Sequence, residues 1–354
     1  MSIILDIEKK VGNFHLNFAY SGEKAVIGIL GASGCGKSMT LKSIAGIETP
    51  DRGQIELEGR TLFNSKKRIN LKPQDRSVGY LFQNYALFPT MTVEQNIMAG
   101  LKGDKQEKRR IAGEMMERFG LEKLAGQLPS ELSGGQQQRT ALARILVTEP
   151  QTLLLDEPFS ALDGSMKERL RLEMGELLHS YDGVSFLVTH DRDEAYQLCD
   201  QLLLMDQGKL IEAGSKEKLF EAPETVTGAR ITSCKNISRI RKTGLYSVRA
   251  LDWGNLEFKT EKPVTKEITH IGIRAHDFYP LNEWEYSMEK RRGINTAFPV
   301  RNPMVTELPF EWCVTFEEGL MWRCPKEIRQ HQAENSIPYG LGVRPSAVML
   351  LREH

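Results

Sequence analysis

One eight-residue stretch carries the residue types that bind a chain of phosphates. Residues 31–38 read Gly-Ala-Ser-Gly-Cys-Gly-Lys-Ser, which fits the pattern Gly-x-x-x-x-Gly-Lys-[Ser/Thr] in full. The glycines let backbone N–H groups approach phosphate oxygens closely, and a helix that starts here adds the positive end of its dipole. An apolar strand expected at 25–30 precedes the stretch, and a helical run at 39–45 follows it. The alternative, a glycine-rich turn without a ligand, explains neither this spacing nor these flanks.

Every residue of this loop is a predicted nucleotide contact. Lys37 is placed to reach the β- and γ-phosphates, and the Ser38 hydroxyl is a predicted Mg²⁺ ligand. Cys35 is expected to be a tolerated small residue and not a reactive one. The predicted contacts are Gly31, Ala32, Ser33, Gly34, Cys35, Gly36, Lys37 and Ser38.

Two adjacent carboxylates follow three leucines at 153–155, an apolar run typical of a buried parallel strand. Ligands of open α/β sheets bind at the carboxyl ends of such strands. Asp156 is therefore predicted to hold Mg²⁺, directly or through water, and Glu157 to polarise an attacking water. The alternative is a solvated turn, which is the usual meaning of an isolated Asp-Glu pair.

A third pattern narrows the class of protein. Residues 132–139 read Leu-Ser-Gly-Gly-Gln-Gln-Gln-Arg, and this string resembles the signature motif of ATP-binding-cassette (ABC) ATPases. Ser133 is expected to cap the helix that follows, so that its first amides bind phosphate. The resemblance implies a head-to-tail homodimer in which the signature of one subunit faces the γ-phosphate held by the other. The predicted contacts are Ser133, Gly134, Gly135 and Gln136.

The remaining motifs of that family occur in order. Gln83 resembles the Q-loop glutamine, which implies contact with Mg²⁺ or with the attacking water. Ser-Ala-Leu-Asp at 160–163 resembles the D-loop, and Asp163 is expected at the dimer interface. His190 resembles the switch histidine, whose imidazole would donate to the γ-phosphate and orient the water with Glu157. The implied catalytic residues are Glu157, His190 and Gln83, and the implied metal ligands are Ser38, Gln83 and Asp156.

One departure concerns the adenine ring. Members of the family stack it on an aromatic residue before the phosphate loop, and Phe14 is the best candidate at a spacing that is short. If side chains alternate along the strand, Phe14 faces the core instead. The sequence leaves both alternatives open, stacking on adenine and packing in the core.

Strand-like and helix-like segments alternate from the start of the chain to about residue 230, as in a mostly parallel sheet covered by helices. The stretch 88–147 shows helical patterns alone and is expected to be a helical subdomain. Residues 1–230 are therefore predicted to form an α/β P-loop NTPase cassette with a mixed sheet core. The strands are expected at the first residues and at 25–30, 77–82, 152–155, 184–189 and 201–205.

After Pro223 the pattern changes to short β-rich runs, two of which are hairpin-like and followed by a related strand-like run. These pairs are 246–258 with 271–276, and 312–322 with 341–346. We predict that residues 231–354 form a small all-β domain with two repeats. Chance similarity among short strands is the alternative. Residues 290–296 are expected to be a solvated loop.

Composition limits the partners and the compartment. Lys+Arg and Asp+Glu are 47 each in 354 residues, which argues against nucleic acid as a partner. No apolar run approaches the roughly 20 residues of a membrane helix, and the start of the chain does not look like a secretory signal. The five cysteines are odd in number and contain no Cys-x-x-Cys pair, which indicates a reducing compartment.

The resemblance extends to function. Residues 84–93 resemble the docking segment of importer ATPases, where Tyr85, Leu87, Phe88 and Met91 would form an exposed apolar cup for a permease helix. The alternative is that these side chains pack inside the helical subdomain. The implied location is the cytoplasmic face of the membrane, bound to two integral-membrane permease subunits, with an extracytoplasmic solute-binding protein as an indirect partner.

The C-terminal region resembles the OB-like TOBE/MOP regulatory domain of importer ATPases, and the layout of the chain is most similar to the molybdate/sulfate type. The resemblance implies an ATPase that uses ATP and Mg²⁺ to power uptake of an oxyanion (molybdate, tungstate or sulfate), with an oxyanion ligand at the C-terminal domain. Import of a sugar, polyamine, iron or phosphonate is the alternative, as is a non-transport ABC ATPase.

Overall fold

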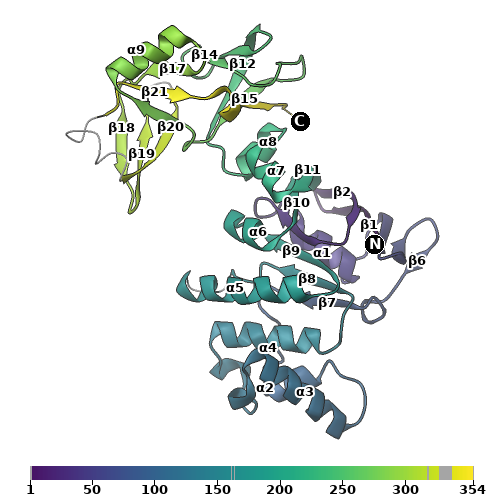
Figure 1. The fold of residues 1–354 in the computed structure, drawn as a ribbon. Coiled ribbons are helices and arrows are strands. Elements are labelled where there is room, and N and C mark those ends of the chain that lie inside the picture. Colours follow the sequence, from purple (N-terminus) through teal and green to yellow (C-terminus); the bar gives the residue numbers. More distant parts are fainter. Residues whose placement is uncertain (1, 161, 163, 317–318, 327–336, 354) are drawn as a thin grey trace. The chain divides into compact units, whose positions relative to one another are not determined.

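The computed structural model describes residues 2–160, 162, 164–316, 319–326 and 337–353 (Figure 1). Its contacts divide the chain into two compact units, Met1–Lys216 and Glu217–His354. This division falls before residue 230, where the sequence predicts the domain boundary.

Eleven strands form one mixed sheet within the described part of the first unit, in the order β6-β5-β4-β1-β2-β11-β10-β3-β9-β8-β7. These strands are β1 (Ser2–Val11), β2 (Phe14–Glu23), β3 (Val26–Leu30), β4 (Arg52–Leu57), β5 (Arg60–Asn64), β6 (Ile69–Asn70), β7 (Val78–Leu81), β8 (Thr152–Asp156), β9 (Val184–Thr189), β10 (Gln201–Asp206) and β11 (Lys209–Ser215).

Five neighbouring strands that the sequence predicts, β10, β3, β9, β8 and β7, pair in parallel with one another. Every residue of β3, β8 and β9 is buried, as expected for strands covered on both faces. Parallel pairing brings the carboxyl ends of β3, β9, β8 and β7 side by side at one edge of the sheet.

An antiparallel layer extends the sheet on the other side. β1 pairs with both β2 and β4, and alternate residues of β2 are buried, as in a strand with one solvated face. The sequence predicts only the first strand of this layer.

The described residues of the first unit form six helices and three short 3₁₀ turns: α1 (Lys37–Ala45), α2 (Val93–Met98), α3 (Lys105–Phe119), α4 (Gly134–Leu146), α5 (Gly164–Ser180), α6 (Arg192–Leu198), η1 (Pro73–Asp75), η2 (Glu122–Leu124) and η3 (Pro129–Glu131). α2, α3 and α4 contact one another around their own apolar core, in the stretch where helices are expected (Figure 1). In the described residues we find no helix that is both long and apolar enough to span a membrane.

The described strands of the second unit form three sheets around a core rich in aromatic residues, in the orders β14-β13-β12-β15-β22, β16-β21-β17 and β18-β19-β20. The strands are β12 (Asn236–Gly244), β13 (Ser247–Ala250), β14 (Leu256–Lys259), β15 (His270–Ile273), β16 (Tyr279–Leu281), β17 (Thr296–Pro299), β18 (Met304–Glu307), β19 (Glu311–Thr315), β20 (Met321–Pro325), β21 (Gly340–Val343) and β22 (Met349–Leu351). The helices are α7 (Lys216–Glu221), α8 (Val226–Ile231), α9 (Glu283–Arg292) and the 3₁₀ turn η4 (Pro345–Ala347).

The two similar sequence runs have similar structures. β13–β14 and β19–β20 are antiparallel hairpins, and the related runs that follow them are β15 and β21. β15 pairs with β22, the strand after β21, whereas β21 pairs with β16, the strand after β15. Each of the two related strands, β15 and β21, therefore pairs with the strand that follows its counterpart in the chain.

The prediction of a loop at 290–296 is partly wrong, because residues 290–292 form the last turn of α9. Asn282 and Glu285 form a capping box at the start of this helix, and Gly293 ends it with a φ of 61°. These two signals in the sequence would have found the helix.

A buried guanidinium caps the C-terminal end of α1. Arg76 is 2% exposed and donates to the carbonyl oxygens of Ser43, Ile44 and Leu71 and to the side chain of Asn70. Burial lowers the pKa of Arg76 to about 10, so the group still carries its charge at neutral pH. Arg76 therefore links the C-terminal end of α1 to the segment that connects β6 to β7.

Arg76→Met should destabilise the first unit by about 3 kcal/mol, because several buried oxygens lose their donors. All four tryptophans, Trp253, Trp284, Trp312 and Trp322, lie in the second unit. In urea, the circular dichroism transition should shift to lower concentration while the tryptophan fluorescence transition stays in place. The exposed Lys67→Met is the control and should change stability by less than about 0.5 kcal/mol. Equal transitions for both variants would contradict the capping role.

Candidate nucleotide site

The predicted phosphate loop connects β3 to α1 and is shaped by close backbone contacts. A Cβ atom on Gly31 would lie 2.2 Å from the carbonyl oxygen of Met205, so glycine is required there. Gly34 and Gly36 have φ angles of 79° and 108°, which favour glycine. Lys37 is buried, and its Nζ donates to the carbonyl oxygens of Gly31 and Ala32 at 2.9 and 3.0 Å.

Cys35 lies beneath the loop and is 4% exposed. Burial raises the pKa of its thiol, so the thiol stays protonated near neutral pH. This agrees with the expectation of a small, unreactive residue.

The two oxygens predicted to hold a metal lie next to each other. Ser38 Oγ donates to Asp156 Oδ1 at 2.7 Å, and Tyr80 OH donates to Asp156 Oδ2 at 2.8 Å. Burial, and then the charge of Asp156, raise the pKa of Tyr80. Tyr80 was not identified from the sequence, although it lies on the adjacent strand β7 opposite Leu154 of β8.

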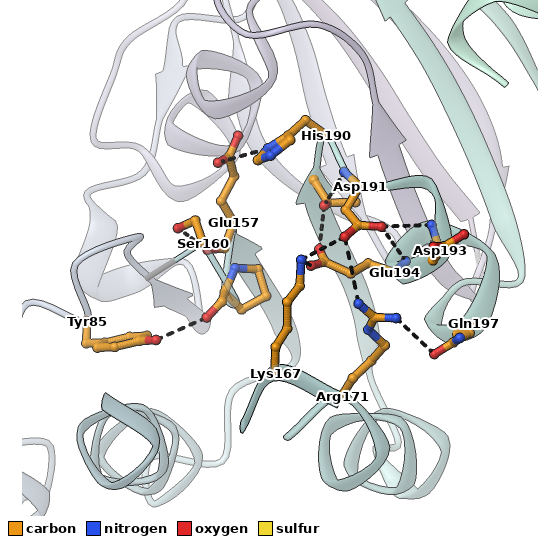
Figure 2. Close-up of polar contacts among 12 residues, drawn as sticks. Tyr85, Glu157, Ser160, Lys167, Arg171, His190, Asp191, Asp193, Glu194 and Gln197 are labelled. Atoms are coloured by element: carbon orange, nitrogen blue, oxygen red, sulfur yellow. Dashed lines mark hydrogen bonds and ion pairs between the residues drawn. The ribbon is translucent and has the colours of Figure 1, made fainter. Parts of the chain in front are cut away.

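Glu157 turns sharply away from the strand that carries Asp156. Its φ is 47°, in the left-handed region that few non-glycine residues adopt, and its N–H donates to the carbonyl oxygen of Val188 on β9. This turn brings Glu157 Oε2 to 3.3 Å from His190 Nδ1 (Figure 2). Strained backbone of this kind is common at functional sites.

A cavity of about 620 Å³ joins these elements. Gln83, Glu157 and much of the phosphate loop line it together, although Gln83 follows β7 and Glu157 follows β8. The predicted residues in its lining are Ser33, Gly34, Gly36, Lys37, Ser38, Gln83 and Glu157. Val11, Met39, Lys42 and Glu48 also line it and were not predicted as site residues.

Phe14 packs against the core, as one of its two alternatives predicts, and its stacking on adenine stays a prediction. It lines this cavity, with its ring edge 3.0 Å from the position of a Cβ on Gly36, and it also packs against the main core. Val11, three residues earlier, is 48% exposed and lines the same cavity.

The signature residues form the N-terminus of α4. Ser133 Oγ accepts from Gln136 N, and Gln136 Oε1 accepts from Ser133 N, so the two residues form a capping box. Gly135 is buried, and a Cβ on it would lie 3.0 Å from Leu170 of α5. The lining of the cavity contains none of the four signature residues within the described part of the chain. Asp163 lies outside the described residues.

A network next to His190 was missed by the sequence analysis. Lys167 of α5 donates to Asp191, the N-cap of α6, and contacts Glu194 at 2.7 Å (Figure 2). Burial acts to lower the pKa of Lys167, but its bonds to the two carboxylates raise it overall. These partners are far apart in sequence, so no local pattern predicts them.

The prediction of an exposed apolar cup at residues 85–91 is wrong for Tyr85. Tyr85 is 3% exposed, and its hydroxyl donates to the carbonyl oxygen of Pro158 at 3.3 Å (Figure 2). Phe88 is 46% exposed, whereas Leu87 and Met91 are partly buried.

The fold and this cavity define a P-loop NTPase. A family model described as ABC transporter matches residues 15–160. A probable sulfate/thiosulfate import ATP-binding protein of Chlorella vulgaris is 42% identical over 230 residues, which are 63% of this chain and 95% of the relative. An Fe(3+) ions import ATP-binding protein of Brucella abortus (strain 2308) is 40% identical over 338 residues, which cover 87% of this chain and 94% of the relative. The chain belongs to the ABC transporter family.

Solved structures agree with this assignment. A dimeric ATP-binding cassette in a post-hydrolysis state, bound to ADP and Pi, matches with a TM-score of 0.52 and 26% identity. The match covers 61% of this chain and 99% of that cassette. The cassette fold predicted from the sequence is confirmed.

Gly31→Ala should weaken nucleotide binding by about tenfold or more, because the added methyl group collides with the carbonyl of Met205 and displaces the loop. Titration with a fluorescent ATP analogue measures this. Gly113→Ala on α3 is the matched control, since no other group lies within 4 Å of its Cβ position. Equal affinity in both variants would show that the loop tolerates the displacement.

Proposed function

We propose that this chain, an ATPase of the ABC transporter family, powers the uptake of an oxyanion through separate permease subunits. The observation that supports this proposal is that residues of the phosphate loop, Gln83 and Glu157 line one cavity. His190 contacts Glu157 at its edge. Hydrolysis of ATP to ADP and phosphate is the reaction that this arrangement supports.

Glu157 is the proposed general base. Its carboxylate polarises the attacking water, and His190 orients that water and donates to the γ-phosphate. Gln83, which lines the same cavity, is proposed to contact the same water. The Lys37 ammonium exchanges the loop carbonyls that it now contacts for the β- and γ-phosphate oxygens.

The chemistry of the donors fits a magnesium ion. Mg²⁺ prefers oxygen ligands, and a hydroxyl and a carboxylate lie 2.7 Å apart where Ser38 meets Asp156. Ser38, Asp156 and Gln83 would hold the ion, directly or through water. When bound, Mg²⁺ neutralises charge on the phosphates. Tyr80 keeps the Asp156 carboxylate oriented toward Ser38.

The signature residues act in a homodimer. Ser133, Gly134, Gly135 and Gln136 do not line the cavity of their own chain, which supports a site completed by the signature of a second copy. The first amides of α4 and its dipole would then meet the γ-phosphate. Asp163 is proposed to lie at the same dimer interface.

The chain is proposed to act at the cytoplasmic face of the membrane, bound to two permease subunits and indirectly to a solute-binding protein. Phe88, exposed at the end of the Gln83 segment, is the apolar side chain best placed to receive a permease helix. Leu87 and Met91, which are partly buried in the same segment, are proposed to add to this apolar surface. Closure of the dimer by ATP and reopening by hydrolysis would rock the permease.

The second unit is proposed to be a TOBE/MOP-like regulatory domain that binds an oxyanion. A cavity of about 680 Å³ is lined by Arg274 and Arg344, which follow the two related strands β15 and β21, and by Ser346. Glu221 and Asp277 also line it, so the anion must contact the arginine side. The Arg274 guanidinium donates to the carbonyl oxygens of Thr232 and Phe220, so Arg344 is the arginine proposed to bind the anion.

Iron is the second candidate solute. The Fe(3+) import relative matches 87% of this chain, including most of the second unit, whereas the sulfate/thiosulfate relative matches 63%. Transport of radiolabelled sulfate, molybdate and iron by cells that carry the chain with its permeases separates these solutes.

Glu157→Gln should lower steady-state ATP turnover by about a hundredfold or more while ATP binding persists, because water activation is lost. The variant should form an ATP-dependent dimer in light scattering. Glu176→Gln, exposed on α5, is the matched control and should behave like the parent protein. Retained turnover in Glu157→Gln would contradict the proposed role.

Calorimetric titration of the full chain with molybdate, tungstate and sulfate tests the oxyanion site. At least one anion should release heat, and Arg344→Ala should weaken its binding by about tenfold. Arg241→Ala, which removes an exposed arginine outside this cavity, should leave the affinity unchanged. No heat with any of the three anions contradicts this part of the proposal.

A further inference from the structure

One arginine of α4 holds the backbone of the segment that follows Gln83. Arg144 Nη1 donates to the carbonyl oxygen of Ala86 at 2.8 Å, and Nη2 donates to that of Tyr85 at 2.9 Å. Its guanidinium carbon lies 5.2 Å from the centre of the Phe88 ring. The planar fork of an arginine suits two neighbouring carbonyls, which a lysine ammonium cannot bind in the same way.

The backbone held by this arginine has an uncommon conformation. Tyr85 and Ala86 have φ angles of 60° and 44°, so two consecutive non-glycine residues lie in the left-handed region. Such residues keep this conformation only where their surroundings enforce it. The two bonds from Arg144 provide that enforcement at both carbonyls.

The same segment is held at two further points. Tyr85 OH contacts the carbonyl of Pro158, next to Glu157 (Figure 2). The buried amide of Asn96 donates to the carbonyls of Phe88 and Met91, and its oxygen accepts from Phe88 N. The segment therefore follows the positions of α4 and of the Glu157 turn and does not move alone.

α4 is one continuous helix with the signature at its first turn. Ser133 caps its N-terminus, and Arg144 lies near its other end, about 15 Å away at 1.5 Å per residue. We infer that Arg144 is the positioning residue through which α4 transmits nucleotide-driven movement of the signature to residues 84–88. This inference rests on the proposed dimer and on the proposed permease docking at Phe88.

Hydrogen–deuterium exchange tests this link in the full chain. In a Glu157→Gln background, ATP should slow exchange in peptides that cover 133–139 and 84–91. With Arg144→Ala added, the ATP effect at 133–139 should persist and the effect at 84–91 should be lost. A purely structural role would raise exchange at 84–91 equally with and without ATP and leave their difference intact. Arg118→Ala is the matched control, an exposed arginine on α3 outside both peptides, and it should keep both ATP effects.

The possible exchange results distinguish failure of the Arg144 link from failure of the proposed dimer on which it rests. If ATP does not slow exchange at 133–139 in the Glu157→Gln protein, the proposed dimer is wrong, and the inference is then wrong as well. If 133–139 is protected and Arg144→Ala keeps the full ATP effect at 84–91, the inference alone is wrong. Should Arg144→Ala not fold, Arg144→Lys decides: a reduced ATP effect at 84–91 supports the link, and a full effect overturns it.

Discussion

The nucleotide site depends on the parallel pairing of four strands. The phosphate loop follows β3, His190 follows β9, Asp156 ends β8 and Gln83 follows β7, and these strands are adjacent in the sheet. Because parallel strands present their carboxyl ends at one edge, residues more than 100 positions apart meet there, as Ser38 and Asp156 do. A one-residue slip of β8 would turn Asp156 to the other face of the sheet, away from Ser38, so the site requires this register.

The same constraint explains how far the sequence could be interpreted. Continuous apolar runs identify buried parallel strands, and short motifs at their ends identify candidate site residues, seven of which line one cavity. Tyr80 was missed because only the pairing of β7 with β8 brings it to Asp156. The burial of Tyr85 was missed for a similar reason: its left-handed φ and its bond to Pro158 come from tertiary structure. The antiparallel layer was missed because its alternating strands look like polar segments in a short window.

α4 joins several of these functions in one element. Its capping box orders the first turn, and buried Gly135 allows that turn to lie close to α5. Its buried face completes the core of the helical subdomain, and Arg144 reaches the segment after Gln83. A single helix thus touches the proposed partner-facing end of the nucleotide site and the proposed docking segment. Its rigidity is what makes movement at one end appear at the other.

Two arginines of this unit, Arg76 buried and Arg144 partly buried, have the same kind of hydrogen-bond partner. Arg76 and Arg144 are both desolvated, which lowers the pKa of each, and both bind carbonyl oxygens instead of forming ion pairs with carboxylates. Carbonyl oxygens satisfy each guanidinium without an added negative charge. Asp156 and Glu157 are the carboxylates with a proposed chemical role at the site, whereas Glu48 lines the cavity without one. The even count of 47 basic and 47 acidic residues therefore does not conflict with polyanion binding, because backbone amides, Lys37 and Mg²⁺ are proposed to meet the phosphates.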